Sequence, residues 1–174
     1  MELKKEGNWL EGIYFAILSK HTDDRGWLCE LLRHDEIKRC AKWANLKFAS
    51  DNIPVPAMCY LSMTGPGVDR GPHEHKEQTD MFCFTGPSDF LIMLWDNRKG
   101  SPTYGKSMKL WMGDSNPCML IVPPGVVHGY RNVGAVPGLV VNFPDRLYKG
   151  MNRDGDVDEI RHESDPNSPF RMGF

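Results

Sequence analysis

Short apolar runs separated by polar turn sequences recur along most of the chain. Runs rich in aromatic and branched side chains, closed by Gly, Pro, Asp and Asn, are typical of β-strands. The predicted strands lie at 12–19, 27–33, 56–63, 81–84, 89–95, 108–112, 118–122 and 138–143. So many short strands in succession predict a sandwich, a jelly roll or a barrel.

Helical periodicity is confined to residues 35–44, which open on acidic side chains and place their apolar residues on one face. The polar, Pro-rich segment 152–174 shows neither the helical nor the strand pattern of apolar residues, and we expect it to lie against the barrel. We therefore expect one all-β domain over residues 1–174, with one or two short helices. A chain of this length can bury roughly 70% of the surface that it exposes when unfolded.

The composition of the chain argues against some classes of binding partner. A formal net charge of −2 gives no basic footprint for nucleic acid or for an anionic membrane. The longest fully apolar run, 90–95, is far too short to span a membrane, and the N-terminal residues lack the apolar core of a signal peptide. The five cysteines are odd in number and contain no C-x-x-C pair, which favours reduced thiols in a cytoplasmic protein.

Histidines gather in two blocks about 50 residues apart. The first block, 67–86, reads G-x5-H-x-H-x4-D-x5-G, and the second, 123–132, reads P-x-G-x2-H-x3-N. Because residues at i and i+2 of a strand point to one face, His73 and His75 can both face the interior of a barrel. The two blocks resemble the paired motifs of the cupin superfamily, whose fold is a double-stranded β-helix, a jelly-roll barrel of mostly antiparallel strands.

The cupin resemblance implies one possible chemistry. In metal-binding cupins, these positions hold a divalent transition metal, and here they are His73, His75, Asp80 and His128. Three imidazole nitrogens and a carboxylate suit such an ion. The chain would then be a metal-dependent enzyme, such as a dioxygenase or a small-sugar isomerase. Each histidine taken alone also has an ordinary interpretation, as part of a solvated rim or as a hydrogen-bonded residue of the barrel wall.

Four longer elements point to a narrower family. They are D-x-R-G-x-x-x-E at 23–30, R-G-x-H at 70–73, D-x-R-x-x-S-x-T-x-G at 96–105, and P-x-G-x-x-H-G-Y at 123–130. In this order and at this approximate spacing they resemble the dTDP-4-dehydrorhamnose 3,5-epimerases. The resemblance implies a metal-free cupin that needs no cofactor. It also implies a homodimer acting on a nucleotide-diphosphate sugar, specifically a nucleotide-linked 4-keto-6-deoxy sugar.

The resemblance also implies roles for individual residues. A proton next to a ketone is acidic because its loss gives an enolate, and a neutral histidine is a suitable base at cellular pH. His73 of R-G-x-H would be that base, and Asp165 would orient it. Return of the proton to the opposite face would invert the carbon. Contacts with the substrate are expected from Arg25, Glu30, Asn52, Arg70, His128 and Asn142.

The sequence departs from this family at two functional positions. Thr79 stands where the family has a lysine that stabilises the enolate, and Asn142 stands where it has a tyrosine that returns the proton. Loss of one oxyanion donor typically costs about a hundredfold or more in rate. Substitutes are expected among His75, Lys76, Tyr104 and Tyr130. A cupin that binds a sugar nucleotide without turning it over therefore stays a further alternative.

Overall fold

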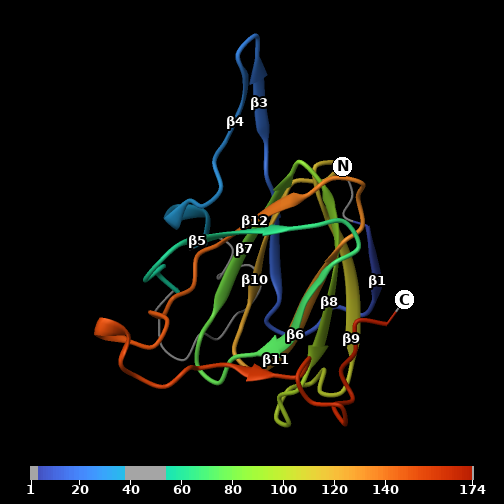
Figure 1. The fold of residues 1–174 in the computed structure, drawn as a ribbon, viewed down its shortest axis with the longest axis vertical. Coiled ribbons are helices and arrows are strands. Elements are labelled where there is room, and N and C mark those ends of the chain that lie inside the picture. The colour runs from blue at the N-terminus through green and yellow to red at the C-terminus, as the bar shows by residue number, and fades with distance from the viewer. Residues whose placement is uncertain (1–3, 38–53, 174) are drawn as a thin grey trace.

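The computed structural model of the chain describes residues 4–37 and 54–173. Its paired strands run antiparallel, and nearly all of them belong to two facing sheets (Figure 1). The first sheet has the order β1 (Lys5–Gly7), β9 (Ser107–Gly113), β8 (Asp89–Asp96), β11 (Val126–Asn132), β6 (Asp69–Glu74) and β13 (Ile160–Arg161). The second has the order β2 (Tyr14–Ile17), β10 (Cys118–Val122), β7 (Asp80–Gly86), β12 (Gly138–Asn142) and β5 (Tyr60–Thr64). The predicted all-β jelly-roll barrel is confirmed.

Apolar side chains fill the space between the two sheets. Phe84, Phe90 and Leu120 are fully buried there, beside the ring of Tyr130. Strands β7 and β10 are buried along their whole length because a second apolar cluster, around Met81 and Ile121, covers the outer face of their sheet. This explains why these strands appear in the sequence as continuous apolar runs, without the alternation of a half-exposed sheet.

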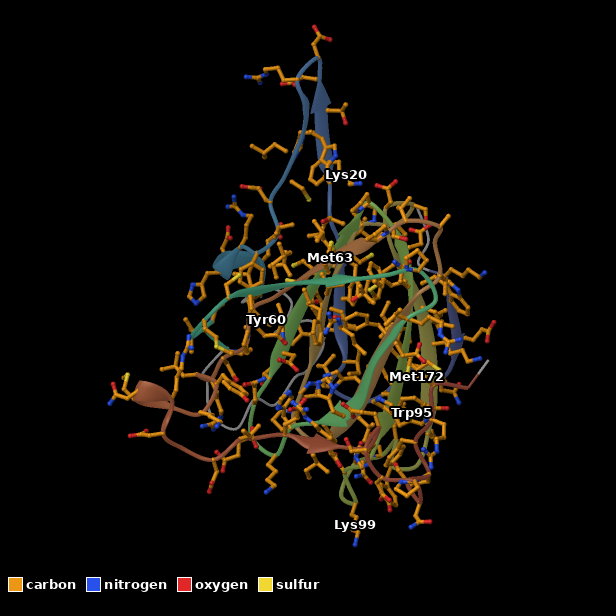
Figure 2. The ribbon with its side chains drawn as sticks, viewed as in Figure 1. Lys20, Tyr60, Met63, Trp95, Lys99 and Met172 are labelled. Carbon is orange, nitrogen blue, oxygen red and sulfur yellow. The ribbon has the colours of Figure 1, made fainter. Side chains whose placement is uncertain are left out.

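A separate hairpin projects from the barrel (Figure 1). It consists of β3 (Lys20–Asp23) and β4 (Gly26–Cys29), and Lys20 ties its base to the barrel through Asp114, at 2.6 Å (Figure 2). The predicted strand 27–33 is therefore shorter than expected, and β3 was missed because its residues are polar. The hairpin is largely exposed and carries two exposed apolar side chains, Trp27 and Leu28.

Little of the chain is helical. Residues 34–37 form a helical turn, and the remainder of the predicted helix 35–44 lies outside the described residues. A 3-10 turn, η1 (Met151–Arg153), lies in the C-terminal segment. That segment is ordered against the barrel as predicted, because β13 pairs with β6. None of the helical segments in the described residues is long and apolar enough to cross a membrane.

The D-x-R-x-x-S-x-T-x-G element builds the turn between β8 and β9. The carboxylate of Asp96 is fully buried and accepts hydrogen bonds from Arg98 (2.8 Å), from the Ser101 hydroxyl (2.5 Å) and from the Thr103 hydroxyl (2.6 Å). Burial opposes the charged form, but these donors outweigh it and lower the pKa of Asp96 to about 2. The element is thus a structural network.

Asp96→Asn should lower the free energy of unfolding by about 2–3 kcal/mol, because one charge-assisted acceptor of several donors is lost. The folded-state pKa lies below the unfolded value of about 3.9, so this contribution is present above that value and is lost as the pH falls through about 2. Urea unfolding against pH, with the exposed Asp154→Asn as control, measures it. A constant difference between wild type and Asp96→Asn down to pH 2 would contradict the prediction.

Candidate functional site

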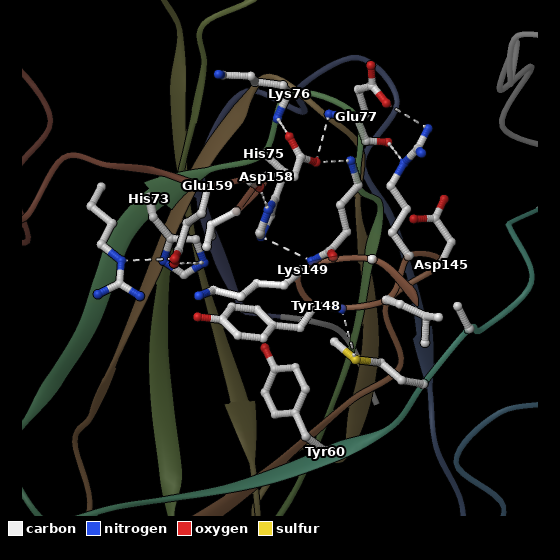
Figure 3. Close-up of a pocket in the computed structure, with 18 of the residues that line it drawn as sticks. Tyr60, His73, His75, Lys76, Glu77, Asp145, Tyr148, Lys149, Asp158 and Glu159 are labelled. Atoms are coloured by element: carbon white, nitrogen blue, oxygen red, sulfur yellow. Dashed lines mark hydrogen bonds and ion pairs between the residues drawn. The ribbon is translucent and has the colours of Figure 1, made fainter. Parts of the chain in front are cut away.

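A cavity of about 1820 Å³ opens at one end of the barrel, between the sheets and the C-terminal segment. Its lining includes Tyr60, Arg70, His73, His75, Tyr148 and Lys149. In Figure 3 the side chains of Tyr148 and Lys149 reach across the cavity toward His73. The cavity therefore combines imidazoles, phenols and cationic groups, with room for a ligand much larger than a free sugar.

Two adjacent strands of the first sheet and one strand of the facing sheet bring the predicted histidines and Asp80 together. His73 lies in β6 and pairs in register with His128 of β11, and Asp80 begins β7. Potential ligand atoms of His73, His75, Asp80 and His128 all lie within 4.8 Å of one another. Gly71 allows this approach: it has a φ of +78°, and a Cβ there would lie 2.7 Å from the His128 carbonyl oxygen. The glycine of R-G-x-H is thus required by packing.

The carboxylate of Asp80 is the centre of this cluster and is almost fully buried. Its Oδ1 accepts hydrogen bonds from the side-chain amides of Gln78 (2.9 Å) and Asn142 (2.8 Å). Its Oδ2 lies 3.1 Å from Nε2 of His75 and 3.2 Å from Nε2 of His128. Burial opposes ionisation, but the neighbouring imidazoles outweigh it, and the pKa of Asp80 lies well below its usual range.

The tautomers of two imidazoles are set by backbone carbonyls. Nδ1 of His128 donates to the carbonyl of Val126 at 3.0 Å, and Nδ1 of His75 donates to the carbonyl of Asp158. Each Nε2 is thereby directed at the Asp80 carboxylate. Burial lowers the pKa of His75, but Asp80 outweighs this and the net shift is upward. The cluster therefore favours positive charge between these imidazoles and the carboxylate.

His73 has different surroundings, because its Nε2 lies 3.8 Å from the carboxylate of Glu159 (Figure 3). Glu159 is in turn paired with Arg161 at 2.9 Å. Burial, together with the neighbouring His128 and His75, lowers the pKa of His73 to about 2. The imidazole of the free protein is therefore neutral across the physiological range, and its burial opposes protonation.

The remaining predicted residues divide into two groups. Arg70 lines the cavity, held by Thr64 (2.8 Å) and by the carbonyl of Met63 (2.8 Å). Asn142 lies beneath the cavity, where its amide binds Asp80 and the hydroxyl of Tyr60 (2.9 Å). The structure therefore brings Arg70, Asn142 and the histidines to one place.

Three predicted residues in the described part of the chain are not brought to this place. Asp165 is exposed in the turn after β13, where its carboxylate accepts a hydrogen bond from the backbone of Asn167 (2.9 Å). Arg25 pairs with Asp23 at the exposed tip of the hairpin. Glu30 is also exposed and pairs with Arg33 (3.2 Å). Asn52 lies outside the described residues.

Two of the residues expected to replace the family's lysine and tyrosine lie in different surroundings. Tyr130 is buried and its hydroxyl lies 2.9 Å from that of Ser62, whereas Tyr104 is exposed in the turn after β8. Sequence reasoning missed the residues of the C-terminal segment that line the cavity, chiefly Tyr148, Lys149 and Glu159. These residues do not belong to a periodic pattern in the sequence. The feature that could have indicated two of them was the adjacent pair Tyr148 and Lys149, in the segment after β12.

The comparisons with known proteins agree with each other. The sequence profile of the dTDP-4-dehydrorhamnose 3,5-epimerase family matches residues 8–141. The chain is 34% identical over 140 residues to the spore coat polysaccharide biosynthesis protein SpsL of Bacillus subtilis, covering 80% of this chain and 82% of SpsL. It is 34% identical over 133 residues to the probable low-salt glycan biosynthesis epimerase Agl13 of Haloferax volcanii, covering 75% and 76% of the two chains.

A solved structure shows the same fold. The crystal structure of a dTDP sugar isomerase from Desulfovibrio desulfuricans superimposes with a TM-score of 0.71 at 23% identity, covering 93% of this chain and 91% of that chain. An identity of 23% supports a shared fold but not a shared reaction. The chemistry of this chain therefore has to be argued from its own cavity.

Proposed function

Since this chain belongs to the dTDP-4-dehydrorhamnose 3,5-epimerase family, we propose that it epimerises a nucleotide-linked 4-keto-6-deoxy sugar by proton transfer next to the ketone. The observation that supports this most is the position of the His73 imidazole, which comes from the R-G-x-H element and lines the cavity within ion-pair range of the Glu159 carboxylate. Family membership favours this isomerase over a metal-dependent dioxygenase and over a cupin that only binds sugar nucleotides.

The first step is removal of the α-proton by His73, which turns the ketone into an enolate and the imidazole into an imidazolium. Glu159 stabilises that imidazolium, in the role expected of Asp165, because its carboxylate lies within ion-pair range of Nε2. A proton then returns to the opposite face of the same carbon. The phenols of Tyr60 and Tyr148 in the same cavity are the acids available for this step. Only protons move, so the reaction needs no redox cofactor.

Binding of the nucleotide requires groups beyond this cavity. Arg70 supplies one cation inside it. Arg25 and Glu30 lie at or near the projecting hairpin, so they would reach a nucleotide only in the cavity of a second copy of the chain. We therefore propose a homodimer in which hairpins are exchanged, with residues 1–174 acting as one cupin domain. The exposed apolar residues Trp27 and Leu28 of the hairpin support this proposal.

The variant Trp27→Ser/Leu28→Ser should be monomeric and should lose at least tenfold in affinity for dTDP, because its hairpin no longer docks on a partner. Light scattering after gel filtration measures the mass, and calorimetry measures the affinity. Val133→Ser removes another exposed apolar side chain, from the turn after β11, and is the control. A monomeric wild type, or a double variant that stays dimeric, would refute the exchange.

The cellular setting follows from the substrate. An enzyme that inverts carbons of a nucleotide-linked sugar supplies building blocks for polysaccharide or glycan synthesis, as the names of the two relatives indicate for those proteins. We place it in the cytoplasm, away from nucleic acid and membranes. The four described cysteines, Cys29, Cys59, Cys83 and Cys118, are free thiols, which suits a reducing compartment.

The proposed reaction is tested by incubating the protein with dTDP-4-keto-6-deoxyglucose and recording proton NMR spectra. Inversion at one or both carbons beside the ketone changes the ring coupling constants, and the spectrum therefore also shows how many carbons are inverted. Formation of an epimer is the expected result. An unchanged spectrum with demonstrated binding would instead identify a cupin that binds sugar nucleotides without turnover.

A further inference from the structure

We propose that Tyr60 is the acid that returns the proton to the opposite face of the sugar, and that Asn142 positions its hydroxyl. This inference rests on the proposed function, because it assigns a further catalytic residue to that reaction. It moves the phenol of the reaction from position 142, where the family has its tyrosine, to the neighbouring strand β5.

Tyr60 and Asn142 are direct cross-strand neighbours. Strand β5 pairs with β12, and in this register Tyr60 lies opposite Asn142. The Cβ atoms of directly opposite residues are about 4.5–5.5 Å apart, and both side chains project from the same face of the sheet. A phenol on residue 60 therefore reaches the region that a phenol on residue 142 would occupy.

The hydrogen bonds of Asn142 leave the proton of the Tyr60 hydroxyl available as a donor. Asn142 Oδ1 accepts from the backbone N–H of Met81 at 3.0 Å, which fixes the orientation of the amide. Nδ2 then donates to Asp80 Oδ1 at 2.8 Å and to the Tyr60 hydroxyl at 2.9 Å. Because the phenol oxygen accepts in this contact, its own O–H is directed elsewhere. In Figure 3 the Tyr60 hydroxyl faces the cavity.

The surroundings of Tyr60 keep that proton in place before the reaction. Burial of the hydroxyl and the charge of Asp80 raise the pKa of Tyr60 well above its ordinary value of about 10, and the hydrogen bond from Asn142 offsets only part of this rise. The phenol is therefore neutral at cellular pH, as an acid has to be. After proton transfer, the phenolate accepts a charge-assisted hydrogen bond from Asn142, which is stronger than the bond to the neutral phenol.

His73 and Tyr60 approach the cavity from facing sheets. His73 lies in β6 of the first sheet, Tyr60 lies in β5 of the second, and both line the cavity. A sugar ring bound between them presents one face to the imidazole and the other face to the phenol. Inversion requires this arrangement, because the base and the acid act on opposite faces of the same carbon.

The protons balance over one turnover. His73 takes the α-proton, and the electron pair of the broken C–H bond passes into the enolate. The O–H bond of Tyr60 then breaks, and its proton forms the new C–H bond while the ketone is restored. The imidazolium loses its proton to water and the phenolate takes one from water, which returns both residues to their starting states.

The other acid available for this step, Tyr148, is placed differently. It comes from the irregular segment after β12, next to Lys149 and Gly150, whose φ angles are +59° and +69°. A group on a paired strand is held more precisely than a group on such a segment. Tyr148 is therefore assigned to contact with the ligand, and Tyr60 to proton transfer.

The test compares deuterium uptake with inversion when the full chain acts on dTDP-4-keto-6-deoxyglucose in deuterated water. In Tyr60→Phe, His73 still removes the α-proton, exchanges it with solvent and returns deuterium to the same face. Inversion should fall by about 10²- to 10³-fold while uptake stays within about tenfold of wild type. Asn142→Leu should raise the ratio of uptake to inversion by about tenfold. A purely structural role of Asn142 would lower both rates together.

Two matched variants complete the experiment. Tyr148→Phe should change uptake and inversion in the same proportion, and Tyr104→Phe, in the exposed turn after β8, should keep both at the wild-type rates. The assignment fails if Tyr60→Phe inverts the sugar as fast as wild type, or if it loses uptake and inversion equally. Uptake without inversion in Tyr148→Phe would make that residue the acid. Absence of uptake and inversion in the wild type would contradict the proposed function itself.

Discussion

His73→Asn should lower the rate of substrate α-proton exchange by about 10²- to 10⁴-fold, the usual contribution of a positioned acid–base group. The amide has a similar size but cannot take up the proton. Affinity for dTDP should stay within about twofold, because the nucleotide contacts are assigned to Arg25, Glu30 and other groups. Exchange followed by NMR and binding followed by calorimetry separate the two effects.

Two further variants make this prediction specific. Glu159→Gln should reduce exchange by only about tenfold, since the base stays in place while the charge that stabilises its imidazolium is lost. Asp165→Asn should leave exchange unchanged, because Asp165 contacts only its own turn among the described residues. The base assignment fails if His73→Asn exchanges at the wild-type rate. A large loss in Asp165→Asn would return the orienting role to that residue.

Lys149→Met should lower exchange by about 10²- to 10³-fold, the effect of losing one stabilising group on a developing oxyanion. The Lys149 side chain lines the cavity and reaches across it toward His73 in Figure 3. Exchange is followed by NMR, and Lys99→Met, in an exposed turn that does not line the cavity, is the control. Full exchange by Lys149→Met would contradict this role.

Much of the barrel could be predicted from the sequence because most of its strands are marked by apolar runs. Strand β3 could not, because a hairpin that projects from the barrel has no buried face and its residues are polar. The sequence indicated that His73 and His128 share a site only through the resemblance of their two blocks to paired motifs. Local spacing could not show it, because the pairing of β6 with β11 joins residues far apart in the chain.

The carboxylate beside His73, that of Glu159, could not be identified from the sequence. Asp165 and Glu159 are six residues apart in a segment with no helical or strand period, and only the pairing of β13 with β6 places Glu159 beside His73. The sequence also could not separate the roles of His73 and His75, since His73-Glu74-His75 fits both two metal ligands and an isolated base. In the structure a backbone carbonyl accepts from Nδ1 of His75 and the Glu159 carboxylate lies near Nε2 of His73, and both groups come from the C-terminal segment.

We propose that this cavity removes a proton beside the ketone of a nucleotide-linked sugar. Wild-type protein incubated with dTDP-4-keto-6-deoxyglucose in deuterated water should introduce deuterium at a carbon adjacent to the ketone. Deuterium in the recovered sugar should appear about 100 times faster than without protein, and His73→Asn should lower this rate by about 10²- to 10⁴-fold. Tight binding of the sugar nucleotide with no deuterium uptake above the buffer rate would contradict it.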